Sequence, residues 1–351
     1  HTLVVYNTLK GLRMFLNKKF IKNIGILCFA LLLLFGMLLF PKLSVSFALS
    51  ALNLWFTKMI PTLFPFMVLS GILIRMNLVR PLCAPLHPAA RFLFGVEESG
   101  VFCIIIGFLC GFPMGAKVIS DLYKRNELSF QEAEYLLSFC NNIGPIYFCG
   151  YVLVTLHVEN KLPFLFGMYG LPLLYGIIRC RIGKRRRFRY AGWEKPVLKK
   201  RKSRPSIRTA SLPEKTESAK FMDALDLSIL SGIENIVKLG GYMIFFNLFN
   251  MLPRILMQKG FFSRFSYIGR VRLTYFFSCF FEISNGVNLV GNKEPLLTLS
   301  MLSFGGICCM AQTYSLIKDT PLSVARYGLN KLFFLFLSGI YYLLLFRLQI
   351  I

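Results

Sequence analysis

The sequence predicts an all-α polytopic membrane protein with two inverted-topology repeats, each containing transmembrane helices and a re-entrant or broken helical hairpin. The chain has 351 residues, of which 55% are hydrophobic, and its mean hydropathy is +0.59. Uncharged runs such as residues 23–41 are long enough to cross a bilayer as helices, which takes about 20 residues. Breaks rich in Gly and Pro also interrupt apolar segments at matching places in both halves.

A basic segment divides the chain. Residues 1–50 are predicted to form a cytoplasmic N-terminal segment and the first transmembrane helix. The first repeat covers residues 51–178, with spans at about 51–74, 135–158 and 162–178 and a re-entrant segment at 100–116. After a linker at residues 179–222, the second repeat covers residues 223–351. Its spans are expected at about 227–252, 295–317 and 332–346, with an interrupted segment at 273–290.

The net charge of +25 is concentrated in the linker. Between Arg179 and Lys220 there are 16 Lys or Arg and 3 Glu, so this stretch supplies 13 of the 25 excess charges. Because it directly follows an apolar span, it is predicted to be a disordered cytoplasmic connection. Its expected partner is the anionic head groups of the lipid bilayer. Nucleic-acid binding is not expected, because no aromatic-interleaved fold surrounds the charges.

Cysteine and histidine usage argues against a metal site. The ten Cys show no paired ligand spacing, and the three His are scattered. Most Cys lie in apolar runs and are predicted to be small buried hydrophobic residues. No His/Asp/Ser or paired-Asp signature is present. The sequence therefore predicts no metal, no cofactor and no enzymatic activity.

Two breaks interrupt the first repeat, at Gly111–Gly115 and at Cys140–Pro145. At membrane depth, the backbone groups freed by such breaks need partners in protein or in a water-filled cavity. The second repeat has corresponding breaks at Glu282–Gly286 and Ser303–Gly306, which match Gly115 with Gly286 and Gly144 with Gly306. Discontinuous helices at equivalent positions typically mark the substrate site of a secondary transporter.

Glu282 is the most informative single residue. An ionisable group within an apolar segment is costly, and such a group usually has a function. Glu282 is therefore the candidate site for a coupling ion or proton. Alternatively, it pairs with a basic residue from the other repeat. One observation conflicts with the predicted topology. The connection after Leu252, expected outside, carries five basic residues, which weakens the positive-inside argument.

Several motifs together resemble one family. They are GFPMGAK (111–117), DLY (121–123), EAEYLLSFCNNIGP (132–145), EISNG (282–286) and SFGGICCMAQ (303–312). The combination is similar to the YlbJ family of sporulation integral membrane proteins, also called SpoVV. This family is related to the gate or nucleoside-recognition repeats of concentrative nucleoside transporters and ferrous iron transporters. The resemblance implies a bacterial multi-pass protein of the mother-cell-derived outer forespore membrane, which moves dipicolinic acid during sporulation.

Dipicolinate carries two carboxylates, so its path requires positive or dipolar partners. Glycines at the breaks would let backbone N–H groups approach it closely, amide and hydroxyl side chains would donate hydrogen bonds, and Lys117 is the candidate charge partner. The predicted substrate-binding residues are Gly111, Gly115, Lys117, Asn141, Asn142, Gly144, Ser284, Asn285, Gly286, Gly306 and Gln312. Alternatively, the glycines serve close packing, the amides cap interrupted helices, and Lys117 reaches the membrane interface or pairs with Asp121.

The leading hypothesis is thus a transporter of a small anionic aromatic acid. Two alternatives are also transport proteins, namely a nucleoside:cation symporter and a metal-ion gate, the latter with Cys110 and Cys140 near the breaks. A third alternative is a non-transporting membrane scaffold of the sporulation machinery. The midmembrane polar breaks argue against a scaffold, which has no need of them. A homo-oligomer is compatible with each hypothesis.

Overall fold

The computed structural model describes residues 18–189, 217–258 and 266–348. In these ranges the chain is helical and contains no strand. Five helices are long and apolar enough to cross a membrane, and a sixth span is obtained if the bent pair 87–94 and 98–110 counts as one. The predicted all-α polytopic membrane protein is therefore confirmed.

The first half begins with two long helices that meet at a sharp corner, Lys18–Leu39 (α2) and the span Pro41–Arg75. This span has a π turn (Trp55–Met59) just before Pro61, which cannot donate a backbone hydrogen bond. The helices of the first half after α2 are α3 (Pro41–Leu54), α4 (Ile60–Arg75), α5 (Val79–Cys83), α6 (His87–Phe94), α7 (Glu98–Cys110), α8 (Met114–Lys124), α9 (Phe130–Leu137), α10 (Pro145–Tyr147), α11 (Leu153–Thr155), α12 (Leu162–Leu165) and α13 (Leu171–Arg189). Further π turns, Phe148–Val152 and Phe166–Gly170, join α10 to α11 and α12 to α13.

The second half also begins with a long helix and ends with a broken helix followed by a long helix, with fewer helices between them than the first half has. Its helices are α14 (Glu217–Leu248), α15 (Met251–Gln258), α16 (Tyr267–Phe281), α17 (Ile283–Val290), α18 (Pro295–Phe304), α19 (Gly306–Ile317) and α20 (Val324–Arg347), with a 3₁₀ turn at Gly291–Lys293. The repeat and the inverted-topology relation between the halves stay predictions.

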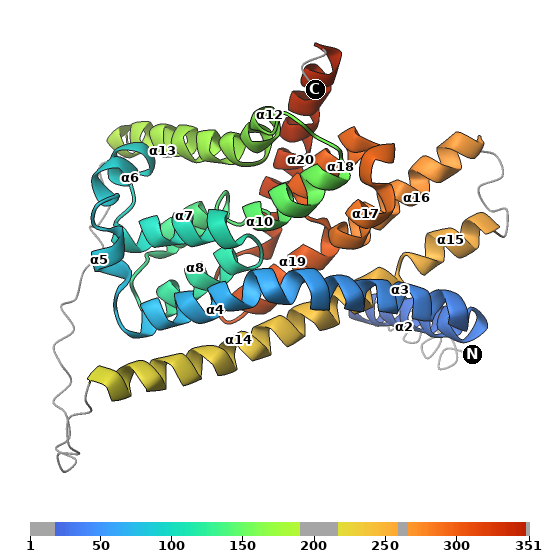
Figure 1. Cartoon of the computed structure of the whole chain (residues 1–351), viewed down its shortest axis with the longest axis horizontal. Coiled ribbons are helices and arrows are strands. Elements are labelled where there is room, and N and C mark those ends of the chain that lie inside the picture. Colours follow the sequence, from blue (N-terminus) through green and yellow to red (C-terminus); the bar gives the residue numbers. More distant parts are fainter. Residues whose placement is uncertain (1–17, 190–216, 259–265, 349–351) are drawn as a thin grey trace, which may run out of the picture.

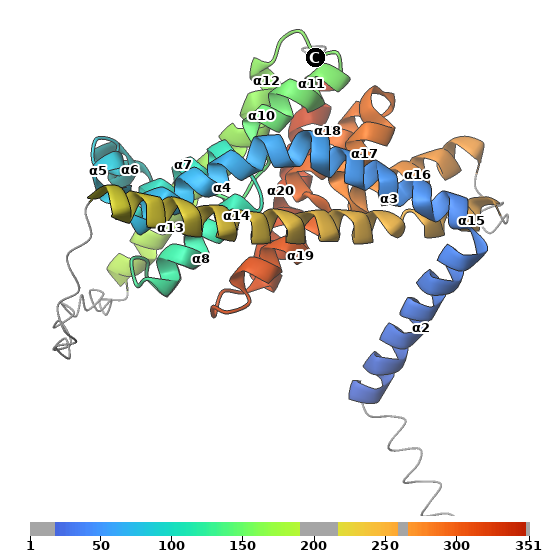
Figure 2. The same ribbon diagram turned by 60° about the horizontal axis from the view of Figure 1, so that its bottom comes forward.

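Helices from the two halves pack against one another along their length. The α3–α4 span of the first half lies antiparallel to α14 of the second, and α8 packs against α19 (Figure 1). Figure 2 shows α2 projecting away from the other helices, and much of its apolar surface is exposed, as expected for a helix in contact with lipid. The described residues form one large core, to which both halves contribute.

Two hairpins reach the middle of the molecule from opposite sides in Figure 1. The first pairs α7 with α8 and turns at Gly111–Pro113, where Gly111 has a φ of +80° that favours glycine. The second pairs α16 with α17 and turns at Glu282. Each hairpin packs on the broken helix that follows it, α10–α11 in the first half and α18–α19 in the second.

The structure corrects or leaves open several predicted details. The stretch between the predicted span at 51–74 and the re-entrant segment at 100–116 is mostly helical, since α5 and α6 occupy it. The break after α9 is longer than predicted, because residues 138–144 are all outside helices. Both ends of the predicted disordered linker are helical, since α13 extends to Arg189 and α14 starts at Glu217. Residues 190–216 lie outside the described residues, so their predicted disorder and the predicted lipid contacts stay predictions.

Glycines hold each hairpin close to its neighbouring break. A Cβ added to Gly107 of α7 would collide with the backbone carbonyl oxygen of Cys140, and one added to Gly115 of α8 would approach that atom to 2.6 Å. In both cases a helix rests directly on backbone rather than on side chains. Small residues allow such close approach in membrane proteins.

We expect Gly107→Ala to destabilise the protein by about 1–3 kcal/mol, because rigid backbone occupies the space of the new methyl group. The measurement is the unfolding midpoint of the purified protein in detergent. Gly241→Ala is the matched control, since this helical glycine has nothing within 4 Å of an added Cβ. Equal midpoints for the two variants would contradict the close contact.

Candidate functional site

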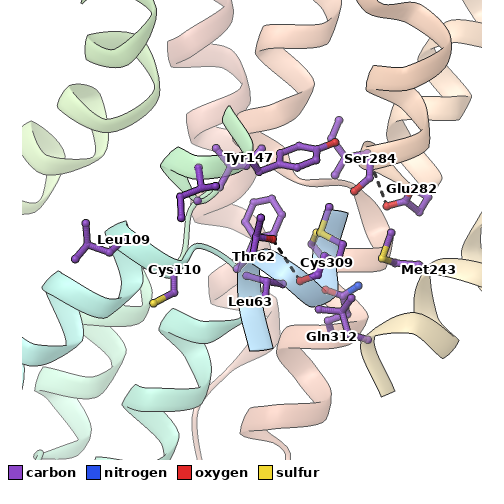
Figure 3. A pocket seen from close by; sticks show the side chains of 17 residues that line it. Thr62, Leu63, Leu109, Cys110, Tyr147, Met243, Glu282, Ser284, Cys309 and Gln312 are labelled. Carbon is purple, nitrogen blue, oxygen red and sulfur yellow. Dashed lines mark hydrogen bonds between the residues drawn. The ribbon is translucent and has the colours of Figure 1, made fainter. Parts of the chain in front are cut away.

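A small pocket lies where the helix breaks meet, and we call it the central pocket (Figure 3). The first half contributes the middle of the α3–α4 span, the α7/α8 turn and the start of α10. The second half contributes α14, the α16/α17 turn and α19. Of the predicted site residues, Gly144, Glu282, Ser284 and Gln312 line this pocket. Both halves therefore line one pocket, and its predicted role as a substrate site stays a prediction.

Glu282 caps the N-terminus of α17. Its Oε1 accepts a hydrogen bond from the Ser284 backbone N–H at 3.1 Å, and its Oε2 accepts one from the Asn285 N–H at 2.6 Å. The side chain is 2% exposed. A carboxylate at this position satisfies free N–H groups and is stabilised by the helix dipole. Glu282 thus has a structural role here, while its predicted role in coupling stays a prediction.

Asn141 and Asn142 occupy the break between α9 and α10, and both are buried. Asn141 Nδ2 donates to Thr313 Oγ1 at 3.1 Å and to Tyr327 Oη at 2.9 Å. Its Oδ1 accepts from the Ala116 backbone N–H at 3.3 Å. Asn141 therefore joins α8 to α19 and α20, and it lies outside the central pocket.

Asn285 has a similar position in the second half. Its Nδ2 donates to Asn247 Oδ1 of α14 at 2.8 Å, and its Oδ1 accepts from Ser50 Oγ of α3 at 2.7 Å. Asn247 Nδ2 in turn donates to the Phe47 backbone carbonyl oxygen at 2.5 Å. Asn285 thus links the second hairpin to two long helices. Its side chain bridges helices and caps none, since Glu282 is the residue that caps α17.

The predicted glycines also serve packing. An added Cβ would clash with the backbone of residues 143–144 at Gly111, and it would come within 2.8 Å of the Cys110 carbonyl oxygen at Gly144. At Gly286 the nearest atom is Cys279 Cα at 2.6 Å, and at Gly306 it is Cys279 O at 3.0 Å. Backbone therefore fills the space in which these glycines would carry a side chain, as the close-packing alternative expects. Of the four, Gly144 also lines the central pocket.

Lys117 is held by an ion pair instead of facing the central pocket. Its Nζ lies 2.7 Å from Asp121 Oδ2, one helical turn away on α8. It lines two neighbouring pockets that are described below. Gln312 lines the central pocket and donates to Cys308 Sγ at 3.1 Å. The predicted direct role of Lys117 with substrate stays a prediction, whereas the alternative pairing with Asp121 is observed.

The sequence analysis missed Lys331. The last span was expected to begin at Leu332, which would have placed Lys331 at the membrane interface. In the structure α20 begins at Val324, so Lys331 lies two turns inside the helix and is 3% exposed. Its Nζ donates to Asn142 Oδ1 at 3.1 Å. The sequence signal that could have located the start of α20 is Ser323, a residue type that favours helix N-termini. Its Oγ accepts a hydrogen bond from the Arg326 N–H at 3.3 Å.

We expect Asn141→Ala to cost about 1–3 kcal/mol of stability, because it leaves the buried Ala116 N–H without its acceptor and removes a hydrogen bond to the Tyr327 hydroxyl. The measurement is again the unfolding midpoint in detergent. Asn288→Ala is the control, since Asn288 makes one exposed hydrogen bond, to Tyr151. A midpoint for Asn141→Ala as high as that of the control would rule out the proposed bridging role.

Comparison with known proteins identifies a relative of this chain. The sporulation integral membrane protein YlbJ of Bacillus subtilis (strain 168) is 26% identical over 353 aligned residues, which cover 93% of this chain and 82% of that protein. No family model matches the chain, and no solved structure matches it. The near-complete coverage agrees with the motifs found in the sequence. It confirms the resemblance to the YlbJ family, and this multi-pass membrane protein is a relative of the sporulation integral membrane protein YlbJ.

Proposed function

We propose that the protein is a transporter that moves a small anionic aromatic acid, dipicolinic acid, out of the mother cell across the outer forespore membrane during sporulation. The observation that carries the proposal is the central pocket, which is bounded by helix breaks from both halves of the chain. Broken helices that meet around a pocket are the usual architecture of a secondary-transporter site. The relative's printed name supports a sporulation role and a membrane location, and the transported solute is our inference.

Buried polar groups favour transport over a scaffold. Asn141, Asn142, Glu282 and Lys331 are all at most 4% exposed; the first three lie at breaks between apolar helices, and Lys331 lies within α20. Each such group is expensive to keep in a membrane, and intramembrane ionisable residues mark solute or ion pathways by default. A protein that only assembles other proteins gains nothing from these groups at its centre.

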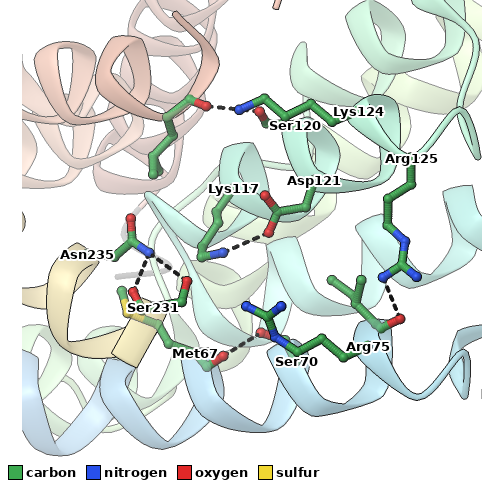
Figure 4. Close-up of polar contacts among 12 residues, drawn as sticks. Met67, Ser70, Arg75, Lys117, Ser120, Asp121, Lys124, Arg125, Ser231 and Asn235 are labelled. Carbon is green, nitrogen blue, oxygen red and sulfur yellow. Dashed lines mark hydrogen bonds and ion pairs between the residues drawn. The ribbon is translucent and has the colours of Figure 1, made fainter. Parts of the chain in front are cut away.

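Positive charge favours an anionic solute. A pocket of about 340 Å³ between α4, α8 and α14, which we call the basic pocket, is lined by Arg75, Lys117, Lys124 and Arg125 against one acid, Asp121 (Figure 4). Three of these basic side chains form ion pairs, Lys117 with Asp121, Lys124 with Asp319 and Arg125 with Glu127, and Asp319 and Glu127 lie outside the lining. Clefts lined by one sign of charge raise the local concentration of oppositely charged solutes. The basic pocket would therefore collect anions.

A smaller pocket joins the basic pocket to the central one. This linking pocket shares Met67 and Lys117 with the basic pocket, and it shares Leu239 and Gln312 with the central pocket. The three pockets follow one another along α8 and α14. The basic pocket includes Ser228 and Ser231, which lie in the first half of α14, the half that follows the basic linker. We therefore assign it to the cytoplasmic side, where the transported solute would enter.

The structure corresponds to a closed conformation in this proposal. The central pocket has about 40 Å³ of free volume, which suffices for a few water molecules at roughly 10–15 Å³ each. An aromatic dicarboxylate needs more room than that. Movement of one hairpin away from its neighbouring break would enlarge the pocket, because glycine contacts, rather than interlocked side chains, hold them together.

The proposal is tested by flux through the purified protein in liposomes, with dipicolinate, uridine and ferrous iron supplied in turn. We expect movement of dipicolinate by the native protein. We expect this flux to be lost in Glu282→Gln, because the substitution removes the negative charge that caps α17 beside the central pocket. Glu234→Gln is the control, since Glu234 is an exposed acid of α14 paired with Lys238. Movement of uridine or iron alone would instead favour the symporter or the metal gate. No movement of any solute would favour a scaffold.

The role of the basic pocket has its own test. We expect Lys124→Gln to lower the initial rate of dipicolinate flux several-fold at low salt, and less at high salt, because salt screens exposed charges. Arg80→Gln is the control, since Arg80 is an exposed basic residue of α5 outside this pocket. Equal rates in the two variants at every salt concentration would exclude electrostatic collection at the basic pocket.

A further inference from the structure

Lys331 is a buried cation without a buried anion to match it. Its Nζ donates to the neutral Asn142 Oδ1 at 3.1 Å and lies 5.7 Å from the ring centroids of both Phe112 and Tyr327. No Asp or Glu of the described residues forms an ion pair with it. An ammonium group has three donors, and one neutral amide oxygen satisfies one of them.

Such a group is costly to hold inside a membrane protein. Aromatic rings offset the desolvation of a cation by about 2 kcal/mol, which is much less than a carboxylate partner would supply. A lysine retained under these conditions requires a compensating role, and the usual role is to bind a solute or ion. The missing partner is therefore expected to be an anion from outside the chain.

Phe112 lies between Lys331 and the central pocket. Its side chain lines the pocket, its ring faces the Lys331 ammonium, and Lys331 itself does not line the pocket. Phe112 is in the turn of the α7/α8 hairpin, and its N–H donates to the Asn142 carbonyl oxygen at 2.5 Å. On the other side, a Cβ added to Gly305 would lie 3.4 Å from the Phe112 ring. The ring thus fills the space between the two broken helices.

We propose that Lys331 binds a carboxylate group of the transported solute, and that Phe112 covers it until the α7/α8 hairpin turn moves aside. This inference rests on the proposed transport of a carboxylic acid, and it names the residue that recognises the carboxylate. In the closed conformation Asn142 Oδ1 holds the ammonium group in place. When Phe112 withdraws, the two remaining donors of Lys331 face the central pocket and form charge-assisted hydrogen bonds with the carboxylate.

The test is equilibrium binding of dipicolinate to the purified full-length protein in detergent, with uridine as the uncharged comparison. We expect Lys331→Met to weaken dipicolinate binding at least tenfold, Lys331→Arg to stay within a few-fold of the native protein, and Lys318→Met, a control at an exposed lysine, to have no effect. Phe112→Ala should accelerate association and tighten binding, because the anion no longer has to displace the ring.

The outcomes separate this inference from the proposed function. Native protein and Lys331→Met that bind dipicolinate equally would overturn the role of Lys331 and leave the transport proposal standing. Native protein that binds no dipicolinate would overturn both. If Lys331→Met does not fold, Phe112→Ala decides, because it leaves Lys331 in place. An unchanged association rate in that variant would refute the covering role of Phe112 and with it the proposed site.

Discussion

The structure depends on one constraint, namely that backbone groups freed by a helix break inside a membrane must find partners within the protein. The two halves meet it with the same device, a hairpin packed against a broken helix. In the first half, the Phe112 N–H of the hairpin turn bonds to the Asn142 carbonyl oxygen, and the Ala116 N–H bonds to the Asn141 side chain. In the second half, Glu282 caps α17, and Gly306 lies against the Cys279 carbonyl oxygen. In the first half, hairpin and break therefore satisfy each other's backbone groups, whereas in the second half the hairpin caps itself and the break packs closely against it.

The same constraint explains which features were predictable. A break is a local event, and its signal is local: Gly, Pro and Asn inside an apolar run, as at Gly111–Pro113 and Gly305. Glu282 was identifiable for the same reason, because one charge in an uncharged segment is conspicuous. The partners of these groups are not local. Nothing in the sequence near Asn141 indicates that its side chain bonds to Tyr327, 186 residues further along the chain.

Lys331 shows where the sequence signal misleads. Lysines at the edge of an apolar run usually extend to the membrane interface, and Lys331 immediately precedes such a run. The helix starts seven residues before Lys331, and α18 and α19 both pack against it, which buries the lysine.

The glycines mislead in the opposite direction. A glycine at a break allows close contact either with a ligand or with another segment of backbone. Only the tertiary packing shows that backbone lies beside Gly111 and Gly286.

The distribution of compensated and uncompensated charge along the pockets distinguishes the transport hypotheses from one another. Two acids near the proposed route form ion pairs, Asp121 with Lys117 and Glu234 with Lys238. A third, Glu282, accepts hydrogen bonds from backbone N–H groups at the N-terminus of α17.

By contrast, Lys331 has only neutral partners among the described residues. Glu282 is the one acid among the residues that line the central pocket, and it already accepts two hydrogen bonds from the backbone of α17. A cation or a metal ion that lost its hydration shell there would have to compete with these N–H groups for the carboxylate, whereas a carboxylate solute finds an unpaired ammonium group at Lys331. This asymmetry, rather than the fold, is the physical reason to prefer an anionic solute.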